Sequence, residues 1–247
     1  MSSSSSQISA RPINASEARV GDMPAYVAKP LEGAHPPILV VIAEIFGLND
    51  HIRDVVRRLA AEGYLAIAPD FFFRAGDPSR ESDITAIRTI VMKVPDEEAM
   101  RDFDAALAFA VSLGGDGTRA AVTGFCWGGR MAWLYAAHNP QLSAAIPWYG
   151  RLDGERTKNQ PQWPIDVADR LAVPYLGLYG GADPSIPLPL VEEMRARLRA
   201  APARGEIVVY PNAPHAFFAD YRESYREAAA RDAFARMLAF LKAQGAA

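Results

Sequence analysis

One cysteine stands in a residue pattern that could make it a nucleophile. Cys126 follows Gly124 by two residues and precedes Gly128 by two. A strand-like stretch, residues 119–123, leads into the pattern, and a helix is expected at 130–137. At a sharp turn from strand to helix the neighbours must be small, because the nucleophile adopts a strained backbone conformation. Such a turn exposes the thiol at a helix N-terminus, which favours the thiolate.

Two further residues could complete a catalytic set with this cysteine. Asp183 follows a strand expected at 175–181, and His215 lies in the loop after a strand expected at 206–210. The chain order nucleophile, acid, histidine is that of α/β-hydrolases. In such a triad the thiolate attacks an acyl carbon, the imidazole transfers the proton, and the carboxylate orients the imidazole. The sequence therefore predicts a triad of Cys126, His215 and Asp183.

Each of the three residues also has a plainer interpretation. Cys126 could be an unreactive thiol in a glycine turn, and Asp183, which precedes a proline, could simply begin a turn. His215 could be an ordinary loop histidine. All three, however, lie just beyond the carboxyl end of an expected strand, the edge at which open α/β sheets bind ligands. All three residues are far less expected to occur in this arrangement by chance than any one of them alone. We therefore favour the triad.

The rest of the chain predicts an α/β fold with a mostly parallel central sheet and helices on both faces. An edge strand is expected at residues 23–30, and buried strands at 38–43, 64–70, 119–123, 142–150, 175–181 and 206–210. Helices are expected at 51–62, 84–92, 96–113, 130–137, 190–200 and 224–243. This alternation indicates βαβ units. We expect a single domain, residues 14–247, after a disordered tail, residues 1–13, with a run of serines.

Composition limits the classes of function. The 247 residues are half hydrophobic and can bury one large core. A net charge of -3 without a basic block argues against a nucleic-acid partner, and no apolar run is long enough to span a membrane. The single cysteine cannot form an intramolecular disulfide, and no cluster of ligands suggests a metal site. Since no signal peptide follows the serine run, we expect a cytoplasmic monomer or small homo-oligomer.

Four segments together resemble the signature segments of the dienelactone hydrolases (carboxymethylenebutenolidases), members of the α/β-hydrolase superfamily. They are Glu44–Gly47, Gly124–Gly129, Gly180–Asp183 and His215–Phe217, and they occur in the family's order. The resemblance covers about residues 25–241. It implies an α/β-hydrolase fold without a large cap domain. It also implies hydrolysis of a small-molecule carboxylic ester or lactone through an acyl-thioester on Cys126, without a cofactor.

The same resemblance implies roles for three residues beside the triad. In that family the residue matching Glu44 contacts the resting thiol and helps to generate the thiolate when substrate binds. The oxyanion hole would consist of the backbone N–H groups of Ile45 and Trp127.

The pattern around the histidine departs from the family where a substrate carboxylate would bind. Dienelactone hydrolases have a serine directly after the histidine and an arginine three residues later, but this chain has Ala216 and Ala219 there. We therefore expect neutral, fairly apolar esters or lactones to be preferred, unless Arg74, Arg88 or Arg222 replaces the missing arginine.

Aromatic residues near the expected site could form the wall of a substrate pocket. In addition to Trp127, the candidates are Phe72, Phe73, Trp148 and Phe217, although ordinary core packing is the favoured interpretation for any one of them. The triad itself also suits a thioesterase or an acyl-transferring enzyme. A non-catalytic protein that keeps the hydrolase fold for binding is a third alternative, which the intact triad and both glycines disfavour.

Overall fold

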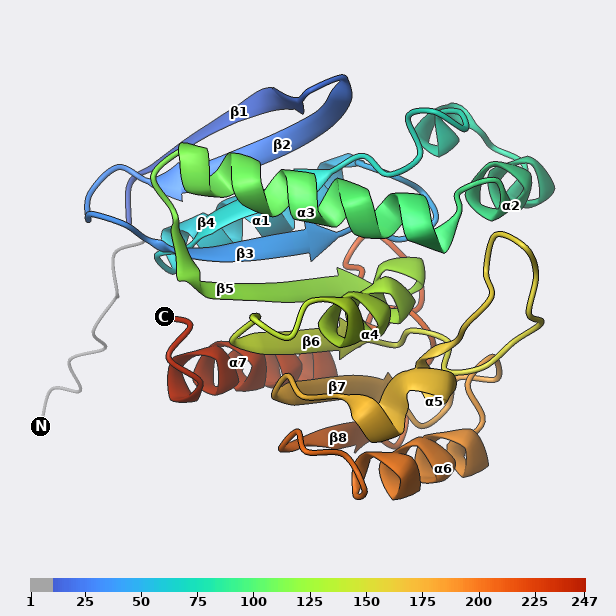
Figure 1. Cartoon of the computed structure of the whole chain (residues 1–247). Coiled ribbons are helices and arrows are strands. Elements are labelled where there is room, and N and C mark those ends of the chain that lie inside the picture. Colours follow the sequence, from blue (N-terminus) through green and yellow to red (C-terminus); the bar gives the residue numbers. More distant parts are fainter. Residues whose placement is uncertain (1–10) are drawn as a thin grey trace, which may run out of the picture.

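An eight-stranded sheet runs through the centre of the computed structural model, which describes residues 11–247 (Figure 1). The strands are β1 (Ile13–Val20), β2 (Met23–Pro30), β3 (Pro37–Ile42), β4 (Leu65–Pro69), β5 (Asp116–Phe125), β6 (Ala144–Trp148), β7 (Tyr175–Gly180) and β8 (Gly205–Tyr210). Their order is β1-β2-β4-β3-β5-β6-β7-β8. The pairs β1–β2 and β2–β4 are antiparallel, and the six strands from β4 to β8 are parallel.

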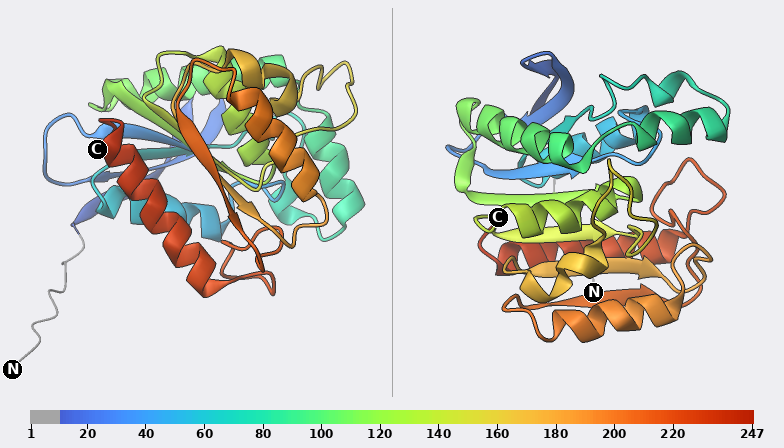
Figure 2. Two further views of the ribbon diagram at one scale, coloured as in Figure 1. Left: turned by 90° about the horizontal axis from the view of Figure 1, so that it is seen from below. Right: turned by 45° about the vertical axis from the view of Figure 1, so that its right-hand side comes forward.

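Helices cover both faces of this sheet. They are α1 (Asp50–Ala61), α2 (Ile84–Met92), α3 (Asp96–Ser112), α4 (Trp127–His138), α5 (Pro164–Val167), α6 (Leu188–Leu198) and α7 (Glu227–Ala243), with 3₁₀ turns η1 (Pro78–Arg80) and η2 (Ala168–Arg170). Helices α1 and α7 lie on one face, and α3, α4 and α6 lie on the other (Figures 1 and 2). The predicted architecture, without a large cap domain, is therefore confirmed. None of the helices within residues 11–247 is long and apolar enough to cross a membrane.

The buried strands are those that the sequence predicts. Every residue of β3, β6 and β7 is buried, because parallel strands with helices on both sides present no face to water. Helix α1 buries Ile52, Val55, Val56 and Leu59, which form one apolar stripe, and exposes its charged residues. Long apolar runs and helical periodicity therefore locate this part of the fold.

The sequence does not predict β1. Its residues alternate between half-buried and exposed, so it has no apolar run, and it is an outer strand that pairs only with β2. The turn between the two strands has Gly21 at a φ of 59°, which glycine adopts without strain. Residues 1–10 of the expected disordered tail lie outside the described residues. Ile13, the last residue of that expected tail, already belongs to β1 and pairs with Pro30 of β2.

The parallel strands bring five loops together at one edge of the sheet. The loops after β3, β5, β6, β7 and β8 carry Glu44, Cys126, Tyr149, Asp183 and His215 respectively. Because these strands are adjacent in that order and all end at the same edge, their loops converge (Figure 1).

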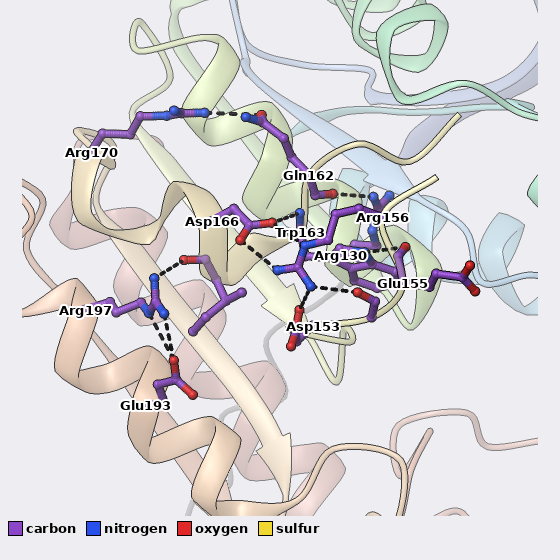
Figure 3. Close-up of polar contacts among 12 residues, drawn as sticks. Arg130, Asp153, Glu155, Arg156, Gln162, Trp163, Asp166, Arg170, Glu193 and Arg197 are labelled. Carbon is purple, nitrogen blue, oxygen red and sulfur yellow. Dashed lines mark hydrogen bonds and ion pairs between the residues drawn. The ribbon is translucent and has the colours of Figure 1, made fainter. Parts of the chain in front are cut away.

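A buried arginine fixes the first turn of α4 to the surrounding elements. Arg130 is 2% exposed, and its guanidinium donates to both carboxylate oxygens of Asp96, at the start of α3, at 2.7 Å. It also donates to the carbonyl of Gln162 at 2.7 Å and lies 4.5 Å from the ring of Trp163 (Figure 3). Arg130 lies four residues after Cys126. Its ion pair with Asp96 therefore fixes the first turn of α4, the helix at whose N-terminus the thiol lies.

The loop between β6 and α5 is ordered by its own polar contacts. Arg156 pairs with Asp166 at 2.7 Å and with Asp153 at 2.5 Å, and the indole N–H of Trp163 donates to the carbonyl of Glu155 at 2.9 Å (Figure 3). These contacts order the loop, and Gln162 and Trp163 near its end contact Arg130 of α4.

Candidate active site

Cys126 occupies a turn that only this arrangement of glycines allows. Its φ of 56° and ψ of -111° lie outside the conformations that side chains ordinarily adopt. A Cβ atom on Gly124 would lie 2.2 Å from the carbonyl oxygen of Gly128, and one on Gly128 would lie 2.4 Å from that of Ile42. The amide of Cys126 donates to the carbonyl of Trp148 at 3.0 Å. Backbone packing against backbone therefore holds the thiol at the N-terminus of α4.

Asp183 and His215 form a close pair beside this thiol. Nδ1 of His215 lies 2.6 Å from Oδ2 of Asp183, which is 4% exposed. The second carboxylate oxygen accepts from the amide of Ser185 at 2.8 Å and from its hydroxyl at 2.6 Å. Cys126 is close enough for its charge and hydrogen bonding to contribute to the raised pKa of His215. The structure thus brings Asp183 and His215 into direct contact, with Cys126 near the imidazole.

The electrostatics of the pair favour a charged imidazole. Burial lowers the pKa of His215, but the hydrogen bonds and charges of Asp183 and Cys126 outweigh it and raise the pKa from 6.5 to about 10. For Asp183 the effect of burial has the opposite sign and raises the pKa. The hydrogen bond and charge of His215, with the hydrogen bonds from Ser185, outweigh it, so the pKa of Asp183 lies below its usual 3.8. The carboxylate is therefore ionised, and at neutral pH the imidazole is held in its protonated, charged form.

Glu44 is buried in the loop after β3, and its contacts are to Tyr221 and Arg222. It is 2% exposed, its Oε2 accepts from the hydroxyl of Tyr221 at 3.3 Å, and Nη1 of Arg222 lies 3.7 Å from the same oxygen. Its Oε1 has no hydrogen-bond partner. Within residues 11–247 no hydrogen bond joins Glu44 to the thiol.

Two backbone N–H groups beside the thiol are free to bind an oxygen. Trp127 is the first residue of α4, where N–H groups have no partner within the helix. Ile45 follows β3 in a loop closed by the Gly47 amide, which donates to the carbonyl of Glu44 at 3.1 Å. Neither the Ile45 nor the Trp127 N–H donates to another group of the described chain.

The candidate pocket residues divide into a few near the thiol and several in the core. Phe72 packs against Trp127 with ring centroids 4.8 Å apart, next to the half-buried Phe73. Trp148 and Phe217 are fully buried, and the indole N–H of Trp148 donates to Thr123 at 3.1 Å. In the free protein these last two pack in the core.

The three candidate arginines differ in how free they are. Arg74 donates to both carboxylate oxygens of Asp102, at 2.8 and 3.1 Å, and pairs with Glu98 at 2.7 Å. Arg88 is exposed on α2. Only Arg222 lies at the site, where it stacks over the ring of Phe46 at 5.2 Å and faces Glu44.

Strained backbone identifies a residue that the sequence analysis missed. Four non-glycine residues between 11 and 247 have positive φ, and three of them, Cys126, Tyr149 and Ala216, lie at this edge of the sheet. Such conformations persist where the surroundings enforce them, often at functional sites. The available signal for Tyr149 was its place directly after a buried strand and before Gly150.

A second pocket lies away from the candidate residues. A pocket of about 280 Å³ lies between α3, α4 and the segment 161–170, lined among others by Met100, Leu134, His138 and Arg170. It contains none of the candidate residues. In the part of the chain that the structure describes, no three His, Cys, Asp or Glu side chains cluster as metal ligands do.

Comparison with known proteins identifies the family. Residues 23–245 match the model of the dienelactone hydrolase family. The chain belongs to this family. A relative from Escherichia coli (strain K12), provisionally named carboxymethylenebutenolidase, is 54% identical over 226 residues, which cover 91% of this chain and 83% of that protein.

Solved structures of the dienelactone hydrolase type share the fold. A crystal structure provisionally titled dienelactone hydrolase, from Klebsiella pneumoniae subsp. pneumoniae MGH 78578, is 52% identical and superposes with a TM-score of 0.92, covering 94% of this chain and 99% of that chain. A dienelactone hydrolase-like promiscuous phosphotriesterase from metagenomic libraries has a TM-score of 0.76 at 22% identity, over 96% of this chain and 99% of that one, and shows the fold alone.

The raised pKa of His215 predicts how the stability of this dienelactone hydrolase family member depends on pH. Because the folded-state pKa of about 10 exceeds the ordinary 6.5, the stabilisation is complete below pH 6.5 and is lost as the pH rises through 10. The free energy of unfolding of the wild type should therefore exceed that of His215→Gln by an amount that shrinks across this window, as measured by urea unfolding. When both proteins also carry Asp183→Asn, the difference in the free energy of unfolding should depend less on pH. A difference that is constant with pH in the wild-type background would contradict the prediction.

Proposed function

We propose that this protein hydrolyses neutral carboxylic esters or lactones through an acyl-thioester on Cys126. Membership of the dienelactone hydrolase family supports the reaction class. The observation that carries the proposal is the 2.6 Å contact between Asp183 and His215, next to a thiol that stands on a strained turn and contributes to the raised pKa of the imidazole. A nucleophile, a base and a group that orients the base are the components that acyl transfer requires.

In the acylation step, His215 already holds the proton of the Cys126 thiol, and the sulfur attacks the acyl carbon of the substrate. The carbonyl oxygen becomes an oxyanion, which the N–H groups of Ile45 and Trp127 stabilise. The bond from the acyl carbon to the leaving oxygen then breaks, and His215 gives its proton to that oxygen. Asp183 stabilises the imidazolium during this step and holds Nδ1.

Deacylation repeats these steps with water in place of the leaving alcohol. His215, neutral after giving its proton to the leaving oxygen, takes a proton from the water, and the water oxygen bonds to the acyl carbon. The bond from carbon to sulfur then breaks and releases the carboxylic acid, while His215 keeps the proton and the starting pair of sulfur and charged imidazole is restored. Glu44, which is buried beside the site with one oxygen free, helps to set the charge of the thiol when the substrate enters.

The charges around the thiol favour a neutral substrate. Ala216 and Ala219 are fully buried and offer neither a hydroxyl nor a guanidinium. The guanidinium of Arg74 is held by two acidic residues of α3, and Arg222 faces the carboxylate of Glu44. A substrate carboxylate would compete with Glu44 for that single cation, and a buried carboxylate without a partner is costly.

Replacing the nucleophile tests the proposed chemistry. Cys126→Ala should lower kcat for p-nitrophenyl acetate by at least about 10³-fold, because no other group can form the acyl-enzyme. His215→Gln should have a comparable effect, whereas His138→Gln, an exposed histidine that pairs with Asp104, should leave kcat unchanged. Circular dichroism of each variant checks the fold. Near wild-type turnover by Cys126→Ala would disprove the assignment.

Substrate charge is tested with a matched pair of lactones. The kcat/KM for a lactone that bears a carboxylate should be at least about tenfold lower than that for the corresponding carboxamide, because no arginine is free to pair with the carboxylate. Steady-state kinetics with both compounds measures the ratio. A ratio well above one that Arg222→Gln reverses would show that Arg222 binds the carboxylate, contrary to this expectation.

A further inference from the structure

Two buried polar atoms near the thiol have no partner in the free protein. The hydroxyl of Tyr149 and Oε1 of Glu44 are both buried, and neither forms a hydrogen bond. Tyr149 is fully buried, so its hydroxyl has no access to bulk water. An unpaired buried polar group destabilises a protein, and each such group in a native structure requires an explanation.

The position of Tyr149 is fixed to the turn that carries the thiol. Its φ of 36° is strained, and its amide donates to the carbonyl of Leu178 at 2.8 Å. The carbonyl before it, that of Trp148, accepts the amide of Cys126 at 3.0 Å. After it, Gly150 lies so close to α4 that a Cβ atom there would be 2.3 Å from the backbone nitrogen of Arg130. The strain therefore serves to place this side chain relative to Cys126.

The ring of Tyr149 packs against the catalytic histidine, and its hydroxyl lies among the charged groups of the site. The ring meets that of His215 edge-on with centroids 5.2 Å apart. Burial first, and then the charges of Glu44 and Cys126, raise the pKa of the hydroxyl well above 10. The hydroxyl thus stays protonated and acts as a hydrogen-bond donor, while Oε1 of Glu44, when ionised, is an acceptor.

We propose that the Tyr149 hydroxyl and Glu44 Oε1 together bind the oxygen of an R–O–H group beside the thiol. The group is the leaving alcohol in acylation and water in deacylation. An R–O–H oxygen accepts from Tyr149 and donates its own hydrogen to Glu44, so one ligand satisfies both unpaired atoms. The inference rests on the proposed acyl-thioester chemistry and adds a leaving-group site to it.

The donor acts on the bond that breaks. As the bond from carbon to the leaving oxygen breaks, negative charge grows on that oxygen until His215 protonates it. The Tyr149 hydroxyl stabilises this charge without transferring its proton, and the newly formed alcohol can then donate to Glu44. In deacylation the same contacts hold water while its proton passes to His215. Tyr149 is thus a catalytic residue for both half-reactions.

Tyr149→Phe removes only the hydroxyl and is the decisive variant. Its kcat/KM should fall by about 10- to 100-fold for benzyl acetate, a poor leaving group, and by less for p-nitrophenyl acetate, whose leaving oxygen needs little stabilisation. Turnover of p-nitrophenyl acetate after the initial burst, which reports deacylation by water, should also slow. The melting temperature should stay the same or rise, because an unpaired buried hydroxyl has been removed.

Tyr135→Phe is the matched control. Tyr135 is equally buried, but its hydroxyl donates to Asp104 at 3.0 Å, so its loss should lower stability and leave both kinetic readouts unchanged. Equal losses by Tyr149→Phe for both esters, or a loss in only one half-reaction, would overturn the shared R–O–H site. If Tyr149→Phe keeps full activity while Cys126→Ala has none, this inference fails and the proposed function stands.

Discussion

Close contact between backbone segments at the end of β5 is the constraint on which the site depends. Gly124 and Gly128 each lie against a carbonyl oxygen that any side chain at those positions would meet. Gly129 lies against Trp148 in the same way, since a Cβ atom there would be 2.3 Å from the Trp148 carbonyl oxygen. These contacts force Cys126 into a positive φ and align the start of α4 with the ends of β3 and β6.

Some buried polar groups around this turn have a partner and others have none. Arg130 and Asp96 satisfy one another behind the turn, where a buried charge without its partner would be costly. In front of it, His215 and Asp183 are paired, but Glu44 keeps one oxygen free and Tyr149 keeps its hydroxyl free. The buried charge of Arg130 therefore has its counterion, although its Nε has no hydrogen-bond partner, and Asp153 Oδ1 also lacks one. The other two buried atoms without a partner within residues 11–247, on Glu44 and Tyr149, belong to the loops that carry the candidate site.

The sequence predicts those parts of the molecule that local patterns determine. Buried apolar runs located β3, β6 and β7, and the glycines around Cys126 predicted a turn whose tight geometry the structure has. Asp183 and His215 could be found because each follows a parallel strand, so the topology alone brings them to one edge. The edge strand β1 was missed because it has no apolar run.

Contacts made by long side chains across the fold could not be predicted in this way. Nothing in the local sequence indicates that Arg74 pairs with Asp102, 28 residues away, or that Tyr221 reaches Glu44, 177 residues away. Tyr149 was missed for a different reason. Its identity is that of an ordinary core aromatic, and only the strained backbone and the unpaired hydroxyl of the folded protein distinguish it.

Direct capture of the covalent intermediate is the measurement that tests the central claim, namely that acyl transfer proceeds through Cys126. The protein would be mixed with p-nitrophenyl pivalate, whose bulky acyl group slows deacylation, quenched in acid during turnover and examined by intact-mass and peptide mass spectrometry. A mass increase of one pivaloyl group, located on the peptide containing Cys126 and removed by hydroxylamine, is the predicted result. Continued turnover with no acyl group on Cys126, or with the acyl group on another residue, would contradict it.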